Sequence, residues 1–426
     1  MALAVVAAGA TTIGGPTGAQ VPPLDGPPLC GSEAGPGAEA ADDGTLRVAT
    51  YNILHTVDDY ADETQGRCIE LVADELAAAA VDIVGMQEVV RSARHGVVAQ
   101  RVAQELAART GDTWAWCFFQ SNPHLPGEPD TGPGGVGGPI SQQIAELARA
   151  GDAPWSEGVA ILARFPIVDQ AAHRLVPRGI ETPACVVANP TDPLAAPTCA
   201  FDTRQVLFAR VATSCGEVDM FSSHLANDAS PVTEEVRVLQ ALDALAQIDA
   251  WATEDEAPDV YTGDFNTEEG SPVWQAVVDG GFVDGFRAAE PSAAGFTGGQ
   301  AIDDPSPTVD QRIDYVFVRP GSELLTPTEA EILGDAPVPF EGSGGEAVVW
   351  PSDHYGVAVS LPFAEPCGQA QLPAPMTSSP EPTTGAAETE GALPATGGVP
   401  GGWLVTAMVA MAAAVGMRGV RDRSSH

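Results

Sequence analysis

Short apolar runs alternate with longer amphipathic stretches through the middle of the chain. In the first half, residues 46–53 are apolar and β-branched, which predicts a central strand in which Asn52 is the terminal polar residue. Residues 82–86 predict a short buried strand that delivers Gln87 and Glu88 at its end. The same reasoning predicts helices over residues 67–80 and 97–109 and a strand over residues 114–119.

The second half repeats this alternation. Residues 260–263 predict a strand that presents Asp264 at its end. Further strands are expected over residues 158–163, 205–213, 217–223, 313–318 and 355–361, with a long helix over residues 233–252. Two similar β/α halves with polar residues at their strand ends predict two packed mixed β-sheets flanked by helices, an α/β four-layer sandwich.

The two ends of the 426-residue chain lack this periodicity. Residues 1–44 are rich in Ala, Gly and Pro, and residues 364–392 form a Pro/Thr-rich spacer, as is typical of flexible segments. We therefore expect one globular domain over residues 45–363. A domain of this size buries about 75% of its unfolded surface, so it can hold a large core.

Both ends also carry features of exported proteins. Residues 1–19 are small and apolar and end in small residues, as in a signal peptide, although the positive n-region is missing. Residues 393–426 contain the pentapeptide LPATG, an apolar run and a tail with arginines. This order resembles the cell-wall sorting signal of Gram-positive bacteria, in which a sortase joins the threonine to peptidoglycan. The alternative is a plain membrane anchor, for which the run is shorter than the roughly 20 residues of a stable span.

The charge of the chain is strongly negative, with 58 acidic residues, 19 arginines and no lysine, for a net charge of −39. Such a surface does not attract a polyanion over long range, because proteins that neutralise several phosphates use clustered Lys and Arg. A bound divalent cation would still attract phosphate locally. The charge therefore weakens a nucleic-acid substrate without excluding it, and solubility or adaptation to salt explains it equally well.

Seven cysteines are present, and none has the spacing of a zinc site. Cys30 and Cys367 lie just outside the two ends of the domain, where a disulfide could join neighbouring termini. Cys185 and Cys199 flank a Pro-rich insertion and could close that loop. The odd count leaves one thiol free, and spacing alone leaves the pairing open.

Seven short polar segments occur in a fixed order along the domain. They are Thr50-Tyr51-Asn52-Ile53, Gln87-Glu88, Ser156-Glu157-Gly158, Ser222-Ser223-His224-Leu225, Gly263-Asp264-Phe265-Asn266, Arg312-Ile313-Asp314-Tyr315 and Ser352-Asp353-His354. As an ordered set they resemble the endonuclease/exonuclease/phosphatase superfamily, which includes pancreatic deoxyribonuclease, abasic-site endonucleases and bacterial sphingomyelinases. The resemblance covers residues 45–363 and implies a deoxyribonuclease-like fold and metal-dependent cleavage of phosphate esters.

The resemblance also implies a metal site. The carboxylates of Glu88 and Asp353 and the amide oxygen of Asn52 match the positions that line it in the superfamily. Oxygen ligands of this kind suit Mg²⁺, with Ca²⁺ and Mn²⁺ as alternatives.

Two histidines are the expected proton-transfer groups. The resemblance pairs His224 with Glu157 and His354 with Asp314, and implies that the histidines do matching work across the scissile phosphate. A carboxylate partner fixes the tautomer of a histidine, orients the ring and raises its pKa.

Asp264 and Asn266 are expected between the two histidines. Asn266, together with His224, can donate to a phosphate oxygen. Asp264 can polarise the attacking water or hold a second metal, so the general base stays open between aspartate and histidine. Arg312 either contacts the substrate phosphate or forms an ion pair in the core.

Together these observations predict a secreted, wall-anchored, monomeric phosphoesterase that acts as a phosphodiesterase or endonuclease on extracellular DNA or RNA. The alternatives are a sphingomyelinase-like phospholipid phosphodiesterase, a phosphatase of small esters, and a non-catalytic binding protein of the same fold. Residues 120–157, 178–204 and 295–311 are the candidate loops for substrate choice.

Overall fold

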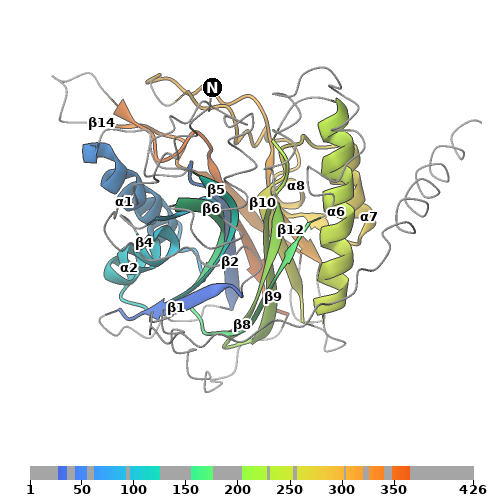
Figure 1. Ribbon diagram of the computed structural model, residues 1–426, viewed down its shortest axis with the longest axis horizontal. Helices are drawn as coiled ribbons and strands as arrows, with labels where there is room; N and C mark the ends of the chain where they lie inside the picture. Colours follow the sequence, from blue (N-terminus) through green and yellow to red (C-terminus); the bar gives the residue numbers. More distant parts are fainter. Residues whose placement is uncertain are drawn as a thin grey trace, which may run out of the picture. The chain divides into compact units, whose positions relative to one another are not determined.

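Two β-sheets lie face to face at the centre of the computed structural model (Figure 1). Each strand contributes alternate side chains to the two faces of its sheet, so one set packs between the sheets and the other packs under the helices. The structure describes residues 27–35, 44–54, 62–92, 96–124, 155–175, 204–227, 231–252, 257–301, 304–319, 326–339 and 348–364.

The first sheet has eight strands in this part of the chain, in the order β1-β5-β6-β3-β2-β16-β13, with β4 paired to β3. Their bounds are β1 Leu29–Glu33, β2 Thr45–Asn52, β3 Ile83–Ser92, β4 Gly96–Val97, β5 Trp114–His124, β6 Trp155–Ala163, β13 Glu329–Leu333 and β16 Gly356–Pro362. Strands β2 and β3 run parallel, and β16 runs antiparallel to β2.

The second sheet has six strands among the described residues, in the order β11-β12-β10-β9-β8-β7. Their bounds are β7 Ile167–Arg174, β8 Gln205–Thr213, β9 Gly216–His224, β10 Asp259–Asp264, β11 Val283–Asp284 and β12 Asp314–Arg319. Strands β9 and β10 run parallel, and β12 runs antiparallel to β10. A separate two-stranded ribbon pairs β14 (Val338–Pro339) with β15 (Val348–Val349).

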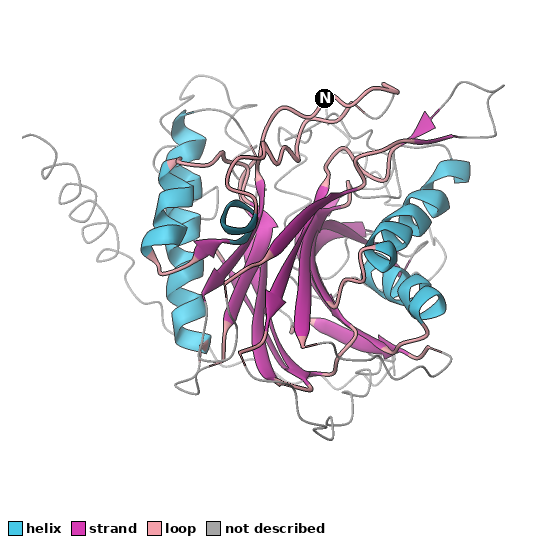
Figure 2. Cartoon of the chain, turned by 180° about the vertical axis from the view of Figure 1, so that it is seen from behind, coloured by secondary structure: helices cyan, strands magenta, loops and turns pink. Residues whose placement is uncertain are grey.

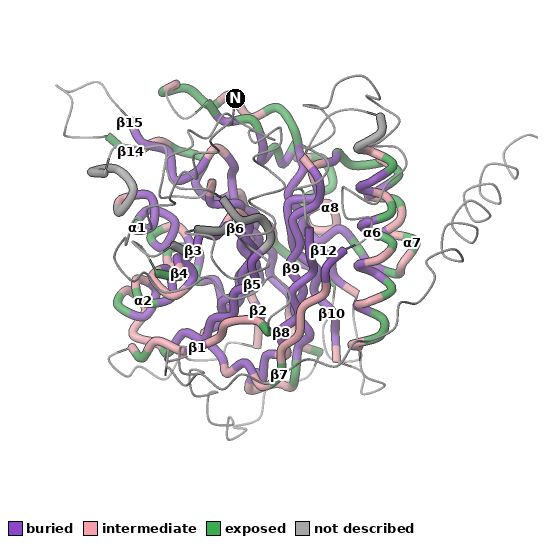
Figure 3. The backbone as a smooth tube through the Cα atoms, in the orientation of Figure 1, coloured by how far each residue is buried: buried purple, intermediate pink, exposed green. Residues whose placement is uncertain are grey.

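Helices cover the outer faces of both sheets (Figure 2). Helices α1 (Asp62–Ala78) and α2 (Val98–Thr110) share one buried apolar cluster with the first sheet. Helices α6 (Pro231–Trp251) and α7 (Pro272–Asp279) share another with the second sheet, and the short α8 (Gly285–Ala289) packs at the end of the central cluster between the sheets. Burial is deepest along the facing strands (Figure 3). The predicted four-layer sandwich is confirmed.

Strand direction gathers the polar motifs at one edge of the sandwich. The carboxyl ends of parallel strands and the amino end of an antiparallel neighbour meet at the same edge of a sheet. In the first sheet this rule brings Asn52, at the end of β2, beside the turn that precedes β16. In the second sheet it brings together His224, Asp264 and Asp314, of which Asp264 is the direct register partner of the other two.

The disulfide found in the structure differs from the expected staple between the termini. Cys30 is bonded to Cys117, its direct neighbour across the β1–β5 ladder, so the bond joins an edge strand to its sheet. Cys215 is also disulfide-bonded, and Cys68 is a buried free thiol. The other cysteines of the two expected pairs lie outside the described residues.

The signal-like and sorting-signal-like segments also lie outside the described residues. Within the described part of the chain, no helix is both long and apolar enough to cross a bilayer.

Candidate active site

Asn52 connects the two sheets at the polar edge. Its Nδ2 donates to Glu88 Oε1 at 3.1 Å within the first sheet and to Asp264 Oδ2 at 3.0 Å in the second. Its Oδ1 accepts from the backbone N–H of Leu54 at 3.1 Å. The amide nitrogen therefore holds two carboxylates in place. The Asn52 oxygen has a second lone pair beside the one used by Leu54, and its expected role as a metal ligand stays a prediction.

Glu88 reaches the site because β3 is irregular at this point. The pairing register of β3 with β6 shifts between Met86 and Val89, and Glu88 has a positive φ of 55°. A bulge of this kind re-aims a side chain without ending the strand. This explains why β3 continues to Ser92, beyond the strand end expected at Gln87 and Glu88.

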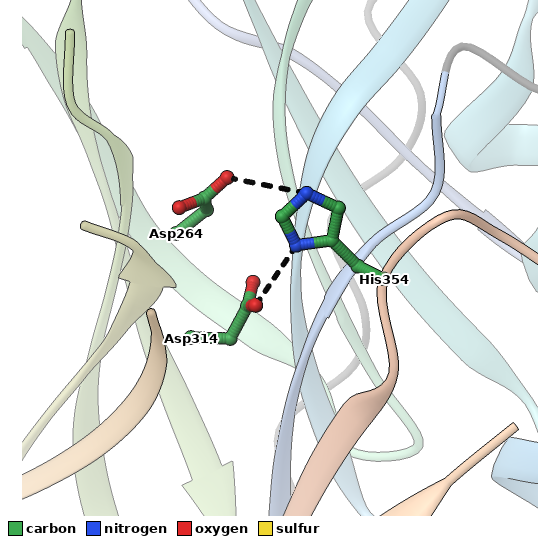
Figure 4. Close-up of side chains that lie close together, drawn as sticks. All are labelled: Asp264, Asp314 and His354. Atoms are coloured by element: carbon green, nitrogen blue, oxygen red, sulfur yellow. Dashed lines mark hydrogen bonds and ion pairs between the residues drawn. The ribbon is translucent and has the colours of Figure 1, made fainter. Parts of the chain in front are cut away.

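His354 stands between two buried aspartates (Figure 4). Its Nδ1 lies 2.9 Å from Asp314 Oδ2, and its Nε2 lies 3.8 Å from Asp264 Oδ2. The structure thus brings together the expected pair of His354 and Asp314. The ligand atoms of these three residues all lie within 4.8 Å of one another, so they could also hold a cation.

The charges in this cluster shift its protonation equilibria. Burial opposes the charged form of His354, but the carboxylates of Asp314, Asp353 and Asp264 outweigh it and raise the pKa of His354 well above 6.5. Burial and the charge of Asp314 raise the pKa of Asp264 to about 7, against the opposing charge of His354. At neutral pH the cluster therefore holds an imidazolium beside a carboxyl group that can gain or lose a proton.

His224 approaches the same aspartate from the neighbouring strand. Its Nε2 lies 3.4 Å from Asp264 Oδ2, and its side chain is 6% exposed. Glu157 is buried on β6, opposite Val90 of β3. The pairing of Glu157 with His224 stays a prediction.

Asn266 is held by the backbone of the site. Its N–H donates to Asp264 Oδ1 at 2.8 Å, its Nδ2 donates to the carbonyl oxygen of Leu225 at 3.0 Å, and its φ is 50°. An amide nitrogen carries two protons, so one remains for an oxygen of the substrate. The left-handed backbone of Asn266 is thus fixed beside the carboxylate that the two histidines share.

Arg312 does not contribute a free guanidinium to the site. It is buried, bonds Asp284 through two nitrogens at 3.1 and 2.7 Å, and bonds Glu269 at 2.7 Å. The guanidinium also lies over the ring of Tyr315, 4.7 Å from its centroid. Of the two roles that the sequence left open, the structure shows the ion pair, and the phosphate contact of Arg312 stays a prediction.

A buried polar seam beneath the site was not predicted. Gln87 accepts from Thr50 Oγ1 at 3.3 Å and donates across the sheets to Ser222 Oγ at 3.2 Å. Thr297 Oγ1 accepts from the backbone N–H groups of Ile313 and Asp314, each at 3.2 Å. Thr50, Gln87 and Ser222 belong to sequence motifs, but no motif indicated that they would contact one another. The role of Thr297 depends on a contact between distant segments.

Of the three candidate substrate loops, the structure describes most of residues 295–311. This segment is attached to the turn that carries Asp353 and His354: Gln300 N–H donates to the carbonyl of Asp353 at 2.9 Å, and Tyr355 N–H donates to the carbonyl of Thr297 at 2.7 Å. The described part of residues 295–311 therefore lies beside the site. Of the other two loops, residues 125–154 and 178–203 lie outside the described residues, and residues 120–124 and 155–157 belong to β5 and β6.

The donor set fits a hard divalent cation. Glu88 and Asp353 are partly exposed carboxylates at the polar edge, and Asp264 is a third carboxylate linked to Glu88 through Asn52. Carboxylate oxygens with space for water are the surroundings that Mg²⁺ prefers. The chemistry of these residues supports a metal site and leaves the identity of the ion open.

An α/β four-layer sandwich that gathers carboxylates, two imidazoles and an asparagine amide at one edge defines a hydrolase of phosphate esters. The chain belongs to the Endonuclease/Exonuclease/phosphatase family, whose model matches residues 49–354. Members of this family are phosphoester hydrolases and are typically metal-dependent, and the chain is accordingly a phosphoester hydrolase.

Comparison with solved structures found similar chains. An endonuclease/exonuclease/phosphatase family protein from Bacteroides thetaiotaomicron has 18% identity and a TM-score of 0.51, covering 77% of this chain and 98% of its own. This match shows the shared fold. An endonuclease/exonuclease/phosphatase from Beutenbergia cavernae has 23% identity and a TM-score of 0.46, covering 75% of this chain and 72% of its own. A mannosyl-6-phosphatase from Bacteroides thetaiotaomicron has 19% identity and a TM-score of 0.49, covering 74% and 99%. Comparison with curated proteins found no match.

Proposed function

We propose that this chain is a secreted, wall-anchored phosphodiesterase that depends on a divalent metal and cleaves extracellular nucleic acid. One observation carries the proposal. The two imidazoles of His224 and His354 reach the same oxygen of Asp264, at 3.4 and 3.8 Å. A phosphate group placed over Asp264 would meet one imidazole on each side.

Each group in this arrangement has a chemical role. Asp264, with its pKa raised to about 7, can take the proton of the attacking water. Because the pKa of His354 is raised, its imidazolium can donate Nε2–H while Asp314 holds Nδ1. With imidazoles on both sides of Asp264, one can neutralise a phosphate oxygen while the other protonates the leaving oxygen. A divalent cation bound by Glu88 and Asp353 would neutralise further phosphate charge.

The lack of a free arginine in the described part of the site favours a phosphodiester over a phosphorylated polyol. Arg312 is neutralised by Asp284 and Glu269. Phosphate binding therefore depends on the imidazoles, the Asn266 amide and a cation. These groups can balance the single charge of a diester, whereas a polyol with several phosphates needs more cationic side chains.

Nicking of supercoiled plasmid DNA by the purified protein tests this function. Mg²⁺, Ca²⁺ and Mn²⁺ are supplied in turn, EDTA is the metal control, and His354→Ala is the site control with its folding checked by circular dichroism. We expect nicking that EDTA and His354→Ala both abolish. Folded wild-type protein that leaves the plasmid intact with every ion would refute the nuclease, and choline phospholipids and small phosphate esters would then be tested.

The proposed wall attachment has its own test. LPATG at residues 393–397 and the apolar run that follows support it. In a host with sortase, the wild-type chain should remain with the peptidoglycan, and Thr396→Ala should move it to the medium or the membrane. An unchanged distribution would contradict sorting while leaving the catalytic proposal intact.

A further inference from the structure

We propose that Gln205 is a substrate-binding residue of this site, whose side-chain amide hydrogen-bonds an oxygen of the phosphate ester beside His224. The inference rests on the proposed phosphoesterase site and names a further residue within it. No motif of the sequence includes Gln205.

The strand register places Gln205 beside His224. Strands β8 and β9 are antiparallel, and their pairing runs without interruption to Val206 opposite Ser223. Gln205 begins β8 and His224 ends β9, so they occupy the next position of the same ladder. The Cα atoms of residues that are directly opposite in such a ladder lie about 4.5–5.5 Å apart, and their side chains project to the same face of the sheet.

That face is the inner one, on which the substrate would bind. Leu207, two residues along β8, belongs to the apolar cluster between the sheets. Arg174, the partner of Gln205 on β7, places its guanidinium 4.7 Å from the ring centroid of Phe119, in the opposite sheet. His224, Gln205 and Arg174 therefore form one inward row across three neighbouring strands.

The amide of Gln205 is fully buried and unused. Its Nε2 and Oε1 both lack a hydrogen-bond partner among the described residues, and the side chain has no exposed surface. Gln87, which is equally buried at the same edge, has both ends of its amide paired. A buried amide without partners lowers stability, so its presence next to a proton-transfer group indicates that a ligand completes it.

Gln205 neighbours a histidine that the substrate must reach. The His224 side chain is 6% exposed and the His354 side chain is 11% exposed, and both must meet the substrate. An amide donor can bind a phosphate oxygen without adding charge, which suits a site whose Arg312 is already neutralised.

Thermal unfolding tests whether the amide is unused in the free protein. Gln205→Met keeps the length of the side chain and removes both polar ends, so we expect its Tm to rise by about 2–4 °C. Gln240→Met is the control, because Gln240 is similarly buried and its Nε2 also lacks a partner, but its Oε1 accepts from Ala226 N–H at 3.0 Å. Its Tm should fall. A fall of similar size in Gln205→Met would show that the amide is paired within the protein and would overturn the inference.

Binding of inorganic phosphate in the presence of Mg²⁺ tests the ligand without requiring turnover. We expect the affinity to fall about tenfold in Gln205→Met and further in Gln205→Glu, which adds a negative charge beside the phosphate. Gln275→Met, on the outer helix α7, should bind as the wild type does. Equal phosphate affinity in the wild type and Gln205→Met would overturn the inference, and so would a wild type that does not bind phosphate.

Turnover of bis(p-nitrophenyl) phosphate separates this inference from the proposed function. We expect Gln205→Met to raise KM about tenfold relative to the wild type and Gln275→Met. Normal wild-type turnover with unchanged constants in Gln205→Met would refute the role of Gln205 alone. Phosphate binding that depends on Gln205 without wild-type turnover of any diester would instead refute the proposed function.

Discussion

Gly85 of the first sheet packs against Thr262 and Ser222 of the second sheet, and its replacement by alanine gives a sharp prediction. A Cβ at this position would lie 2.0 Å from Thr262 Oγ1 and 3.1 Å from Ser222 Oγ. Real Cβ atoms essentially never come within 3.0 Å of such an atom, so either Thr262 must rotate and lose its 2.9 Å hydrogen bond to the Phe221 carbonyl, or one of the two strands must move by about 1 Å. Overpacking of this kind costs about 1–3 kcal/mol.

The movement should also affect catalysis, because the site spans the same gap. The bond from Asn52 Nδ2 to Asp264 Oδ2, 3.0 Å long, joins the two sheets two residues beyond the register position of Gly85. A misplacement of about 1 Å in a catalytic constellation can cost about 100-fold in rate. We therefore expect Gly85→Ala to lose both stability and turnover although it touches no substrate.

Urea unfolding and kcat, measured on Gly85→Ala, Thr262→Ala and the double variant, would test this reasoning. Thr262→Ala removes the oxygen that the new methyl group would meet, so the double variant should be more stable than the sum of the single effects predicts. Its kcat should also recover part of the loss. Strictly additive effects, or a Gly85→Ala variant with wild-type stability and kcat, would show that the sheets have room at this point.

Three further predictions concern charges and the disulfide. Asp314 raises the pKa of His354, so this pair stabilises the fold below about pH 6.5, and the contribution is lost as pH rises through the higher folded pKa. Between pH 7 and pH 9 the unfolding free energy of Asp314→Asn should fall less than that of the wild type. Urea titrations at each pH measure this, and an equal fall in both proteins would contradict it. Arg312→Met leaves the buried carboxylate of Asp284 without its cation, whereas the exposed Glu269 keeps Arg287, and should lose about 3–5 kcal/mol with KM nearly unchanged. A large rise in KM with normal stability would instead indicate that Arg312 contacts the substrate phosphate. Replacing both Cys30 and Cys117 by Ser should cost about 2–4 kcal/mol and leave kcat unchanged, because they join β1 and β5, away from the site. Lost kcat in the folded variant would contradict that separation.

The central part of the fold could be predicted from the sequence because its strands are locally distinctive. The apolar runs that end at Asn52 and Asp264 form central strands, and the polar residues at their ends meet as expected. Strand β7 escaped prediction because residues 167–174 show little alternation and lie mostly half-buried at the edge of a sheet. Helix α7 was also not predicted, because it is short. Its start depends on Ser271, whose side chain accepts from Trp274 N–H.

Contacts between distant segments were beyond the sequence pattern. The partners of Arg312 are Asp284 and Glu269, which lie 28 and 43 positions away and carry no motif. The bond between Cys30 and Cys117 follows from the register of β1 with β5, which spacing cannot reveal. The orientation of the Asn52 amide likewise depends on its neighbours in both sheets and not on the residue type.

The position of β16 has a consequence for how the enzyme becomes active. This strand is the last of the first sheet in chain order, yet it is not an edge strand, because it lies between β2 and the edge strand β13. Ser352, just before β16, donates to the carbonyl of Asn52 across 300 positions, and His354 follows two residues later. A nascent chain that does not yet include β16 lacks His354 and the strand that joins β13 to the rest of the first sheet. Closing so long a loop is also slow. We therefore expect hydrolytic activity to begin only after the whole domain has been synthesised. The strand order delays activity without a separate inhibitor.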